Sequence, residues 1–295
     1  LDCMVETASL HDKVTFGRTG LSVSRLAIGS SYGVGGADLE RAFERGVNFM
    51  FWGLRRTATF AAGVKSIARK DREGLVLAIQ SYSRSALLMR LSVESALRRL
   101  GLDHVDLLTL GWWNERPPQR IVDAALALQQ RGKVRHLMIS SHHRPTFEQL
   151  IADPAFGAVM VRYSAAHPGA EREVFPHLGE RRPGVLGFTA TRWGTLLSRE
   201  LVPAEERTPT SVDCYRFVLS NPAVNVSLAG PKDGAQLDLA LSALDRGPMD
   251  ADELAWMRRV GAVVRTHARK GSPVDTLDKI ATAFRKLRTP ASAQR

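Results

Sequence analysis

The chain has 295 residues, of which 44% are hydrophobic and 24% charged, and its formal net charge at pH 7 is +11. This length and apolar content are enough for one large core, so a single domain is the simplest organisation. Cys3 and Cys214 are too few and too far apart for a disulfide framework, which favours a reducing, cytoplasmic setting. The sequence opens without a long apolar run, so we expect neither a secretory leader nor a membrane anchor.

The excess of basic residues raises the question of nucleic-acid binding, because clustered lysine and arginine gain affinity from phosphate contacts. Here the basic residues are spread over helix-like segments such as "ESALRRLG" and "LQQRGKVR". Such spreading is typical of solvated helix faces. We therefore expect no membrane partner, and nucleic acid is the least favoured class of partner.

Apolar runs alternate with helix-like segments along the chain, and this alternation favours a parallel sheet covered by helices. The eight runs cover residues 26–32, 47–52, 75–82, 105–112, 134–140, 158–164, 184–190 and 224–230. Eight such units predict an α/β protein with a closed (β/α)8 TIM barrel. On this interpretation residues 1–12 are a flexible N-terminal arm, residues 13–280 are the barrel and residues 281–295 are a basic C-terminal tail.

The active sites of this fold lie on the loops that follow the strands, so the strand ends supply the candidate ligand-binding residues. These residues are Trp52, Arg55, Arg56, Arg84, Trp112, Trp113, Arg162, Tyr163, Arg192 and Trp193. Guanidinium groups bind carboxylate or phosphate, and indole rings stack on flat molecules or cations. The pattern predicts a pocket for a small anionic or aromatic molecule. In the competing interpretation, several of these side chains point outward or fill the end of the barrel.

Several motifs, in register along nearly the whole barrel, resemble the aldo-keto reductase family. "VTFGRTGLSVSRLAIGSS" resembles its opening hairpin and first strand, and "SVESALRRLGLDHVDLL" resembles a characteristic helix and the strand after it. "GVLGFTATRWGTLL" resembles a later strand and its loop. The resemblance implies a barrel with an N-terminal β-hairpin and extra C-terminal helices, and an NADP-linked oxidoreductase that reduces carbonyl compounds.

The positions that correspond to the catalytic tetrad of the family carry other residues. Family members use Asp, Tyr, Lys and His, of which the tyrosine donates a proton while the nicotinamide supplies hydride. Matching the strands places Phe51 at the aspartate, Arg56 at the tyrosine, Gln80 at the lysine and Gly111 at the histidine. The resemblance therefore implies a tetrad-deficient member of the family.

The cofactor-binding positions of the family are matched in part. Ser140 corresponds to a serine that contacts the nicotinamide amide, and Phe188 to an aromatic residue that stacks on the nicotinamide. Lys232 and Gln236 correspond to contacts with the 2'-phosphate and the adenosine, whereas Met160 replaces a glutamine. NADP(H) is thus the cofactor that the resemblance implies, and its binding is left open because several directional hydrogen bonds are lost.

Two other titratable residues are candidates for the catalytic groups. Tyr82 lies two positions beyond Gln80, and His142 follows the fifth apolar run. A tyrosine becomes a stronger acid when positive charge lowers its pKa, and Arg84 or Arg56 is a candidate source of that charge. In the competing interpretation both residues are ordinary polar members of the barrel rim. No metal site is predicted. His142 and His143, after the fifth run, are neighbours in the chain, and adjacent residues of a strand point to opposite faces.

Three classes of function follow. The preferred one is an enzyme with altered reduction or redox-neutral chemistry, because polar and aromatic residues are kept at the strand ends. The alternative is a non-catalytic pseudoenzyme that binds a ligand or a dinucleotide. A basic nucleic-acid binder is the least favoured. The sequence specifies neither the substrate nor the oligomeric state.

Overall fold

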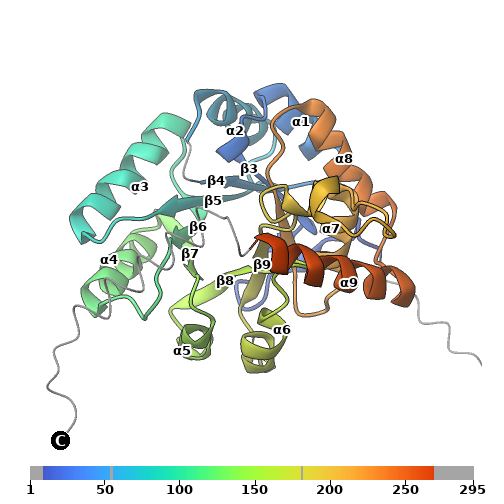
Figure 1. Cartoon of the computed structure of the whole chain (residues 1–295). Coiled ribbons are helices and arrows are strands. Elements are labelled where there is room, and N and C mark those ends of the chain that lie inside the picture. Colours follow the sequence, from blue (N-terminus) through green and yellow to red (C-terminus); the bar gives the residue numbers. More distant parts are fainter. Residues whose placement is uncertain (1–8, 54–55, 181, 269–295) are drawn as a thin grey trace, which may run out of the picture.

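The computed structural model describes residues 9–53, 56–180 and 182–268 (Figure 1). Most of the predicted N-terminal arm and all of the predicted C-terminal tail lie outside the described residues. The same is true of the candidate ligand-binding residue Arg55.

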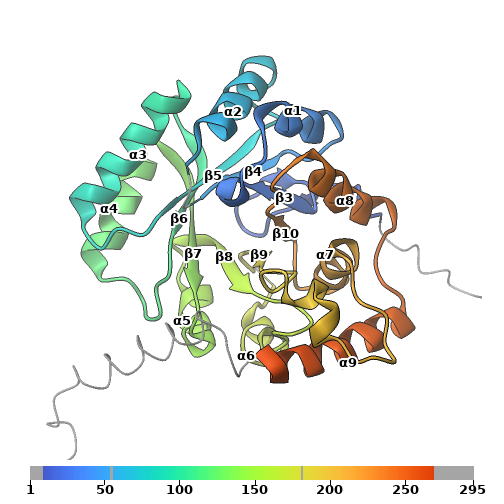
Figure 2. The ribbon, with the colours of Figure 1, turned by 45° about the horizontal axis from the view of Figure 1, so that its top comes forward.

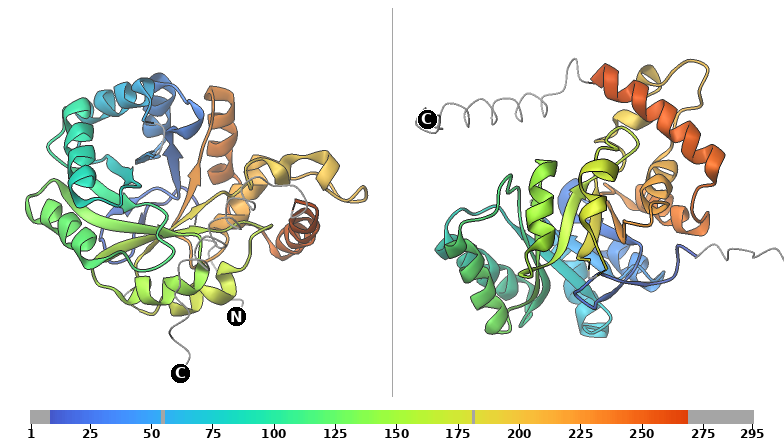
Figure 3. Two further views of the ribbon diagram at one scale, coloured as in Figure 1. Left: turned by 60° about the vertical axis from the view of Figure 1, so that its left-hand side comes forward. Right: turned by 90° about the horizontal axis from the view of Figure 1, so that it is seen from below.

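Eight parallel strands close into a barrel, as the alternation of apolar runs and helices predicts, in the order β10-β3-β4-β5-β6-β7-β8-β9 (Figure 3). The strands are β3 (Leu26–Gly29), β4 (Phe49–Trp52), β5 (Val76–Ser81), β6 (Val105–Leu110), β7 (Val134–Ser141), β8 (Phe156–Arg162), β9 (Gly184–Phe188) and β10 (Val226–Ala229). All eight apolar runs of the sequence contribute one strand each. The prediction of a (β/α)8 barrel is confirmed.

Each strand divides its side chains between two cores, because successive residues point to opposite faces. On β4, Phe49 and Phe51 belong to the cluster inside the barrel, whereas Met50 and Trp52 belong to the larger cluster outside it. This alternation explains why the strands read as continuous apolar runs. It also decides which residue at each strand end faces the lumen.

Helices surround the strands and cover the outer core (Figure 1). They are α1 (Gly36–Glu44), α2 (Ala58–Lys70), α3 (Ala86–Leu100), α4 (Gln119–Gln130), α5 (Phe147–Ala152), α6 (Ala170–Glu173), α7 (Ser211–Leu219), α8 (Gly234–Asp245) and α9 (Ala251–Ala268). Local signals set their ends: α3 begins after Ser85, whose side chain accepts a hydrogen bond from the Leu88 N–H, and ends at Gly101 in the left-handed conformation.

An antiparallel hairpin of β1 (Val14–Thr15) and β2 (Ser22–Val23) precedes the barrel, as the family resemblance implies. Phe16 is fully buried in the inner cluster and packs edge to face on Phe49, with ring centroids 5.6 Å apart. Gly17 has a φ of +50°, and a Cβ there would lie 2.1 Å from the backbone nitrogen of Gly184. Only glycine allows this close approach. The hairpin thus packs at the N-terminal end of the strands and leaves their C-terminal ends for a site.

Helix α9 lies across the side of the barrel, next to α7 and with its far end near α6 (Figure 2). Trp256 and Met257 bury its inner face. Arg216 of α7 donates to Glu253 of α9, with 2.7 Å between Nη2 and Oε2, and also to the carbonyls of residues 247 and 248. The two helices are therefore joined by a largely buried ion pair. Within the described part of the chain, we find no helix with the length and apolarity needed to cross a bilayer.

Candidate functional site

Gly111, directly after β6, makes room at the barrel mouth for side chains at and just after the end of β5. A Cβ at position 111 would lie 2.8 Å from Nε2 of Gln80 and 2.8 Å from a ring carbon of Tyr82. These distances are shorter than non-bonded contacts allow, so any side chain at this position would have to displace one of its neighbours. The Tyr82 ring and the Gln80 amide therefore occupy the space that a larger residue at 111 would fill.

Tyr82 is 40% exposed, and its ring and the Gln80 side chain both lie against Gly111. Burial of the ring raises the pKa of Tyr82 above its usual value, and the hydrogen bond from Gln80 opposes this rise because it favours the phenolate. The expectation that Arg84 or Arg56 lowers the pKa of Tyr82 is therefore wrong. Tyr82 stays protonated near neutral pH and is a hydrogen-bond donor at the mouth.

Three aromatic rings form a stack across the ends of β6, β7 and β9. The Trp112 ring lies 4.9 Å from that of His142 at an angle of 25°, and His142 lies 5.9 Å from Phe188 at 30°. The N–H of Trp112 donates to Oγ of Ser140 at 2.9 Å, and Trp112 has a φ of +53°. A positive φ is rare for a bulky residue, so the surrounding contacts hold Trp112 in a strained conformation.

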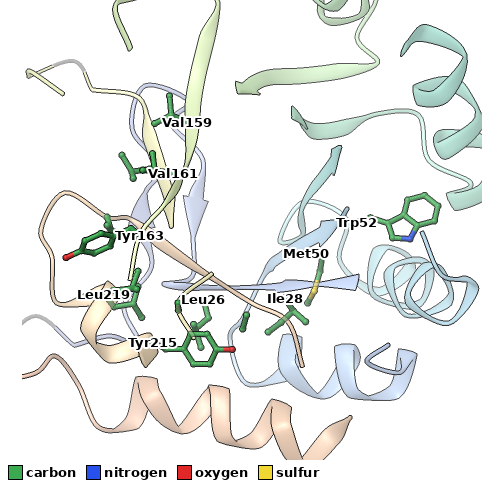
Figure 4. Close-up of a cluster of buried hydrophobic side chains, with 14 of the residues drawn as sticks. Leu26, Ile28, Met50, Trp52, Val159, Val161, Tyr163, Tyr215 and Leu219 are labelled. Atoms are coloured by element: carbon green, nitrogen blue, oxygen red, sulfur yellow. The ribbon is translucent and has the colours of Figure 1, made fainter. Parts of the chain in front are cut away.

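Three predicted ligand-binding residues lie in the outer core instead of the lumen. Trp52 is fully buried in the outer core (Figure 4). The guanidinium groups of Arg56 and Arg99 lie 5.5 and 5.1 Å from the centroid of its ring. Tyr163 is 1% exposed, and its hydroxyl donates to Oε1 of Glu171 at 2.6 Å. Trp113 is 6% exposed. Trp52 points to the outer core because successive side chains of β4 alternate between the two faces, and its neighbour Phe51 points into the lumen.

Two predicted arginines hold loops together. Nη2 of Arg56 donates to the carbonyl of Gln80 at 2.7 Å, and Nη1 donates to the carbonyl of Ser92 at 3.2 Å. Arg84 stacks on Trp113 at 3.8 Å and donates to the carbonyl of Gly111 at 3.2 Å. Both guanidinium groups therefore make structural contacts at the strand ends, and their role as substrate ligands stays a prediction.

The remaining predicted arginines, Arg162 and Arg192, lie on the side of the mouth toward α9. Arg162 ends β8 next to Phe188 in the register of the sheet. Arg192 is 3% exposed and donates to the carbonyl of Val264 on α9 at 2.9 Å, whereas the adjacent Trp193 is exposed. Arg192 and Trp193 have φ values of +50° and +52°, so this loop after β9 is strained.

His167, in the loop after β8, is the group that these arginines surround. Burial, followed by the charges of nearby arginines, lowers the pKa of His167 to about 3. The arginines concerned are Arg162, Arg192, Arg265 and Arg144. His167 is therefore neutral near pH 7, and the local charge comes from the guanidinium groups. In the described ranges, no group of three histidine, cysteine or acidic residues is placed to hold a metal ion.

The residues that correspond to nicotinamide contacts do not fit that ring in this arrangement. The hydroxyl of Ser140 accepts a hydrogen bond from the Trp112 N–H, and Met160 offers a thioether where a polar anchor is expected. The His142 ring already stacks on Phe188, with 5.9 Å between the centroids. A ring between them would need about 7 Å, twice the usual stacking distance.

The residues that correspond to the phosphate end are more accessible. The Lys232 side chain is 64% exposed, with its Nζ 3.9 Å from Oδ2 of Asp233. Oε1 of Gln236 accepts a hydrogen bond from the Lys232 N–H at 3.1 Å, which orders the loop before α8. Lys232 is thus available to an anion, whereas Gln236 already has a role within the loop.

Two features of the site were not predicted from the sequence: the placement of Gln80 next to Tyr82, and the group of arginines around His167. Gln80 and Tyr82 are two residues apart at the end of one strand, and this spacing places two side chains on the same face. That signal was present in the sequence. The arginines come from four separate segments, so only the folded chain brings them together.

The fold and the mouth define a parallel (β/α)8 barrel with a polar and aromatic site at the C-terminal ends of its strands. The model of the Aldo/keto reductase family matches residues 59–213, more than half of the chain, and the chain belongs to this family. Family membership supports an oxidoreductase, and members typically bind NADP(H).

Solved structures show the same fold. The chain is similar to the holo form of aldo-keto reductase AKR11C1 from Bacillus halodurans, with a TM-score of 0.72 and 20% identity over 84% of this chain and 96% of that chain. It is similar to the apo form with a TM-score of 0.71 and 21% identity over 84% of this chain and 95% of that chain. At these identities the similarity concerns the fold.

Proposed function

We propose that this protein is a divergent, tetrad-deficient enzyme of the aldo-keto reductase family that acts on a small aromatic or anionic carbonyl compound. Tyr82 is proposed as the proton donor. The supporting observation is that the ring of Tyr82 occupies the space beside Gly111 at the barrel mouth, next to the Gln80 amide. Phe51, Arg56, Gln80 and Gly111 stand at the positions of the usual tetrad, so the acid comes from another residue.

A protonated tyrosine suits a redox-neutral reaction at a carbonyl group. The raised pKa of Tyr82 keeps its hydroxyl protonated, so the hydroxyl can donate a hydrogen bond to a carbonyl oxygen as negative charge develops there. His142, whose ring stacks on Trp112, is the proposed base that accepts a proton from the carbon next to the carbonyl. Together they would transfer one proton from that carbon to His142 and one proton from Tyr82 to the carbonyl oxygen, which gives the enol, and solvent would carry a proton from His142 back to Tyr82.

The proposed substrate class follows from the groups around the mouth. Trp112, His142 and Phe188 provide flat aromatic faces, which favour an aromatic ring. Arg162 and Arg192 place positive charge on the side toward α9, which favours a carboxylate. Because the nicotinamide contacts do not fit, we derive no hydride-transfer step.

A non-catalytic dinucleotide-binding barrel is the second candidate function. It is favoured by the contrast between exposed Lys232, which can meet a phosphate, and Phe188, whose ring is stacked on His142. Such a protein would bind the phosphate end of NADP(H) without placing its nicotinamide for reaction. It would be stabilised by the ligand and show no turnover.

Phenylpyruvate is a suitable probe, because it joins a carboxylate, a carbonyl and an aromatic ring. We expect the purified protein to accelerate the exchange of its side-chain methylene protons for deuterium, followed by NMR. Tyr82→Phe should slow this exchange by about 100-fold, the lower end of the usual contribution of a general acid. Tyr32→Phe, at an exposed tyrosine of another loop, is the matched control and should leave the rate unchanged.

Equal exchange rates with and without protein would contradict the enzymatic proposal for this substrate class. If Tyr82→Phe and the wild-type protein accelerate exchange equally, Tyr82 is not the acid. Reduction of phenylpyruvate on addition of NADPH, followed by loss of NADPH absorbance, would instead show that the family reaction survives.

A further inference from the structure

Asn114 joins the two loops that carry Trp112 and His142. It lies in the loop after β6, and β7 is the neighbouring strand of the barrel (Figure 2). Its side-chain oxygen, Oδ1, accepts a hydrogen bond from the backbone N–H of His142 at 3.0 Å. The hydroxyl of Ser141 donates to the same oxygen over a longer distance, 3.4 Å. One side chain of the β6 loop thus holds the backbone at the end of β7, at the residue whose ring enters the aromatic stack.

The backbone of Asn114 is tied to the same segment through Thr146. Oγ1 of Thr146 lies 2.7 Å from the carbonyl oxygen of Asn114 and 2.8 Å from Nδ1 of His143. A hydroxyl group has one proton and a carbonyl oxygen can only accept, so the proton of Thr146 goes to Asn114. Nδ1 of His143 must then donate to Thr146, which fixes the tautomer of the neutral imidazole. The two adjacent histidines therefore differ: His143 helps to hold Asn114, whereas His142 belongs to the stack.

The partner ring in the stack, that of Trp112, is held by the same pair of loops. The N–H of Trp112 donates to Oγ of Ser140 at 2.9 Å, and the N–H of Trp113 donates to the Ser140 carbonyl at 2.8 Å. These bonds fix the backbone of the β6 loop against the end of β7, and the bond from His142 to Asn114 fixes the backbone of the β7 loop in return. The distance of 4.9 Å between the two rings therefore depends on Asn114.

A side chain that joins two loops also contributes to stability, wherever it lies, because it satisfies backbone donors. A purely stabilising role predicts a lower melting temperature on substitution and no specific change at the His142 ring. A positioning role predicts such a change, because the bond goes to the backbone of His142 itself. The two roles are therefore separated by a measurement on that ring.

We propose that Asn114 is a positioning residue, which holds the His142 ring in its stack with Trp112 and Phe188. The inference rests on the proposed function in one respect, namely that His142 is the base; the position of the ring can be measured without any substrate. The group that is needed is a hydrogen-bond acceptor, because Nδ2 of Asn114 donates to no other described residue. A carboxylate at this position can accept the same two hydrogen bonds.

The test compares Asn114→Ala and Asn114→Asp in the full chain by proton NMR of the histidine rings, at the alkaline end of the titration, where the imidazole is neutral. The ring current of Trp112, 4.9 Å away, should move the His142 signals upfield, and their absence from the spectrum of His142→Ala assigns them. We expect Asn114→Ala to lose this upfield shift and Asn114→Asp to keep it.

The same variants are compared in the deuterium exchange of phenylpyruvate. Asn114→Ala should lower kcat by about tenfold to about 100-fold with little change in KM, because a misplacement of about 1 Å can cost about 100-fold in rate. Asn114→Asp should retain most of kcat, whereas its charge should raise KM for this anion.

Asn221→Ala is the matched control. Oδ1 of Asn221 accepts a hydrogen bond from the Ala223 N–H at 3.0 Å, in the loop between α7 and β10 at the opposite end of the strands. This variant should lower the melting temperature and leave the His142 signals and kcat unchanged. Unchanged His142 signals in Asn114→Ala, or the same change in Asn221→Ala, would overturn the inference. Loss of the upfield shift in Asn114→Ala alone, in a protein that shows no exchange even as the wild type, would support the role of Asn114 and contradict only the proposed function.

Discussion

Gly111 shows how one missing side chain shapes the mouth of this barrel. Its position lets the Tyr82 ring and the Gln80 amide pack over the end of β6. The phenol is thereby partly buried, which raises the pKa of Tyr82. A residue without chemistry of its own thus decides where the proposed proton donor lies.

Gly111→Ala should move the Tyr82 side chain while leaving the fold intact. Its Cβ would overlap the Gln80 amide and the Tyr82 ring, so we expect a loss of about 1–3 kcal/mol in the free energy of unfolding, as for other overpacked sites. Deuterium exchange into phenylpyruvate should fall together with it. Chemical denaturation and the exchange assay check both effects.

Gly35→Ala is the control for this substitution, because a Cβ there has only an ordinary contact, 3.5 Å from Oδ2 of Asp38. It should leave the free energy of unfolding and the exchange rate close to their original values. If Gly111→Ala is as stable and as active as Gly35→Ala, the packing of Tyr82 over residue 111 does not matter for the site.

At the scale of elements, α9 is joined to α7 by the ion pair between Arg216 and Glu253. Arg216 is 6% exposed and reaches Glu253 while also donating to two backbone carbonyls. The hydrogen bond and the charge of Arg216 lower the pKa of Glu253, although partial burial opposes this. Helix α9 is therefore fixed from its first turn.

Glu253→Gln should destabilise the protein near neutral pH by about 2 kcal/mol, because it removes the partner of a buried guanidinium. The ionised form of Glu253 is stabilised by folding, so its contribution is full above the ordinary glutamate pKa near 4.5 and is lost as the pH falls through the lower folded value. Wild type and Glu253→Gln should therefore converge in acid. Urea denaturation across this pH range measures the difference.

Asp252→Asn is the control for the ion pair, because Asp252 is exposed in the same turn of α9. Its loss should change the free energy of unfolding by only a few tenths of a kcal/mol, as expected of a surface charge near a helix N-terminus. If both variants lose the same stability at neutral pH, the buried pair is not what fixes α9.

At the scale of the whole molecule, the main functional question is how well the barrel fits the phosphate end and the nicotinamide end of NADP(H). The exposed amine of Lys232 can meet a phosphate, whereas the His142 ring covers Phe188. We expect weak binding of NADPH to the wild type by calorimetry, and tighter binding to His142→Ala, because removal of the imidazole opens the face of Phe188. If NADH binds both proteins more weakly than NADPH does, the difference in affinity is assigned to the 2'-phosphate.

Tight binding of NADPH to the wild type would contradict this expectation and favour the usual NADPH-dependent reduction of the family. Equal affinities in the wild type and His142→Ala would show that the stack on Phe188 is not what limits binding. Phe43→Leu, a change of similar kind on α1 and away from the mouth, is a suitable control for a loss of aromatic volume.

Much of the architecture was predictable from local patterns. Apolar runs at the correct spacing predicted each of the eight strands, and helix caps such as Ser85 and Gly101 are visible in the sequence. The site was predictable only as a set of strand ends. Trp52 shows why: a shift of one residue along a strand moves a side chain from the lumen to the outer core, and this cannot be seen until the register is known.

The sequence by itself determined that this chain folds into a (β/α)8 barrel. The pattern of apolar residues that forms each strand is local, and eight such strands in succession form one closed sheet. The sequence also determined the family. The tertiary structure decided which strand-end residues are available for chemistry, because hydrogen-bonding partners and burial depend on segments far apart in the chain. It turned Arg56 and Arg84 into structural ties, raised the pKa of Tyr82 and gathered the arginines beside α9.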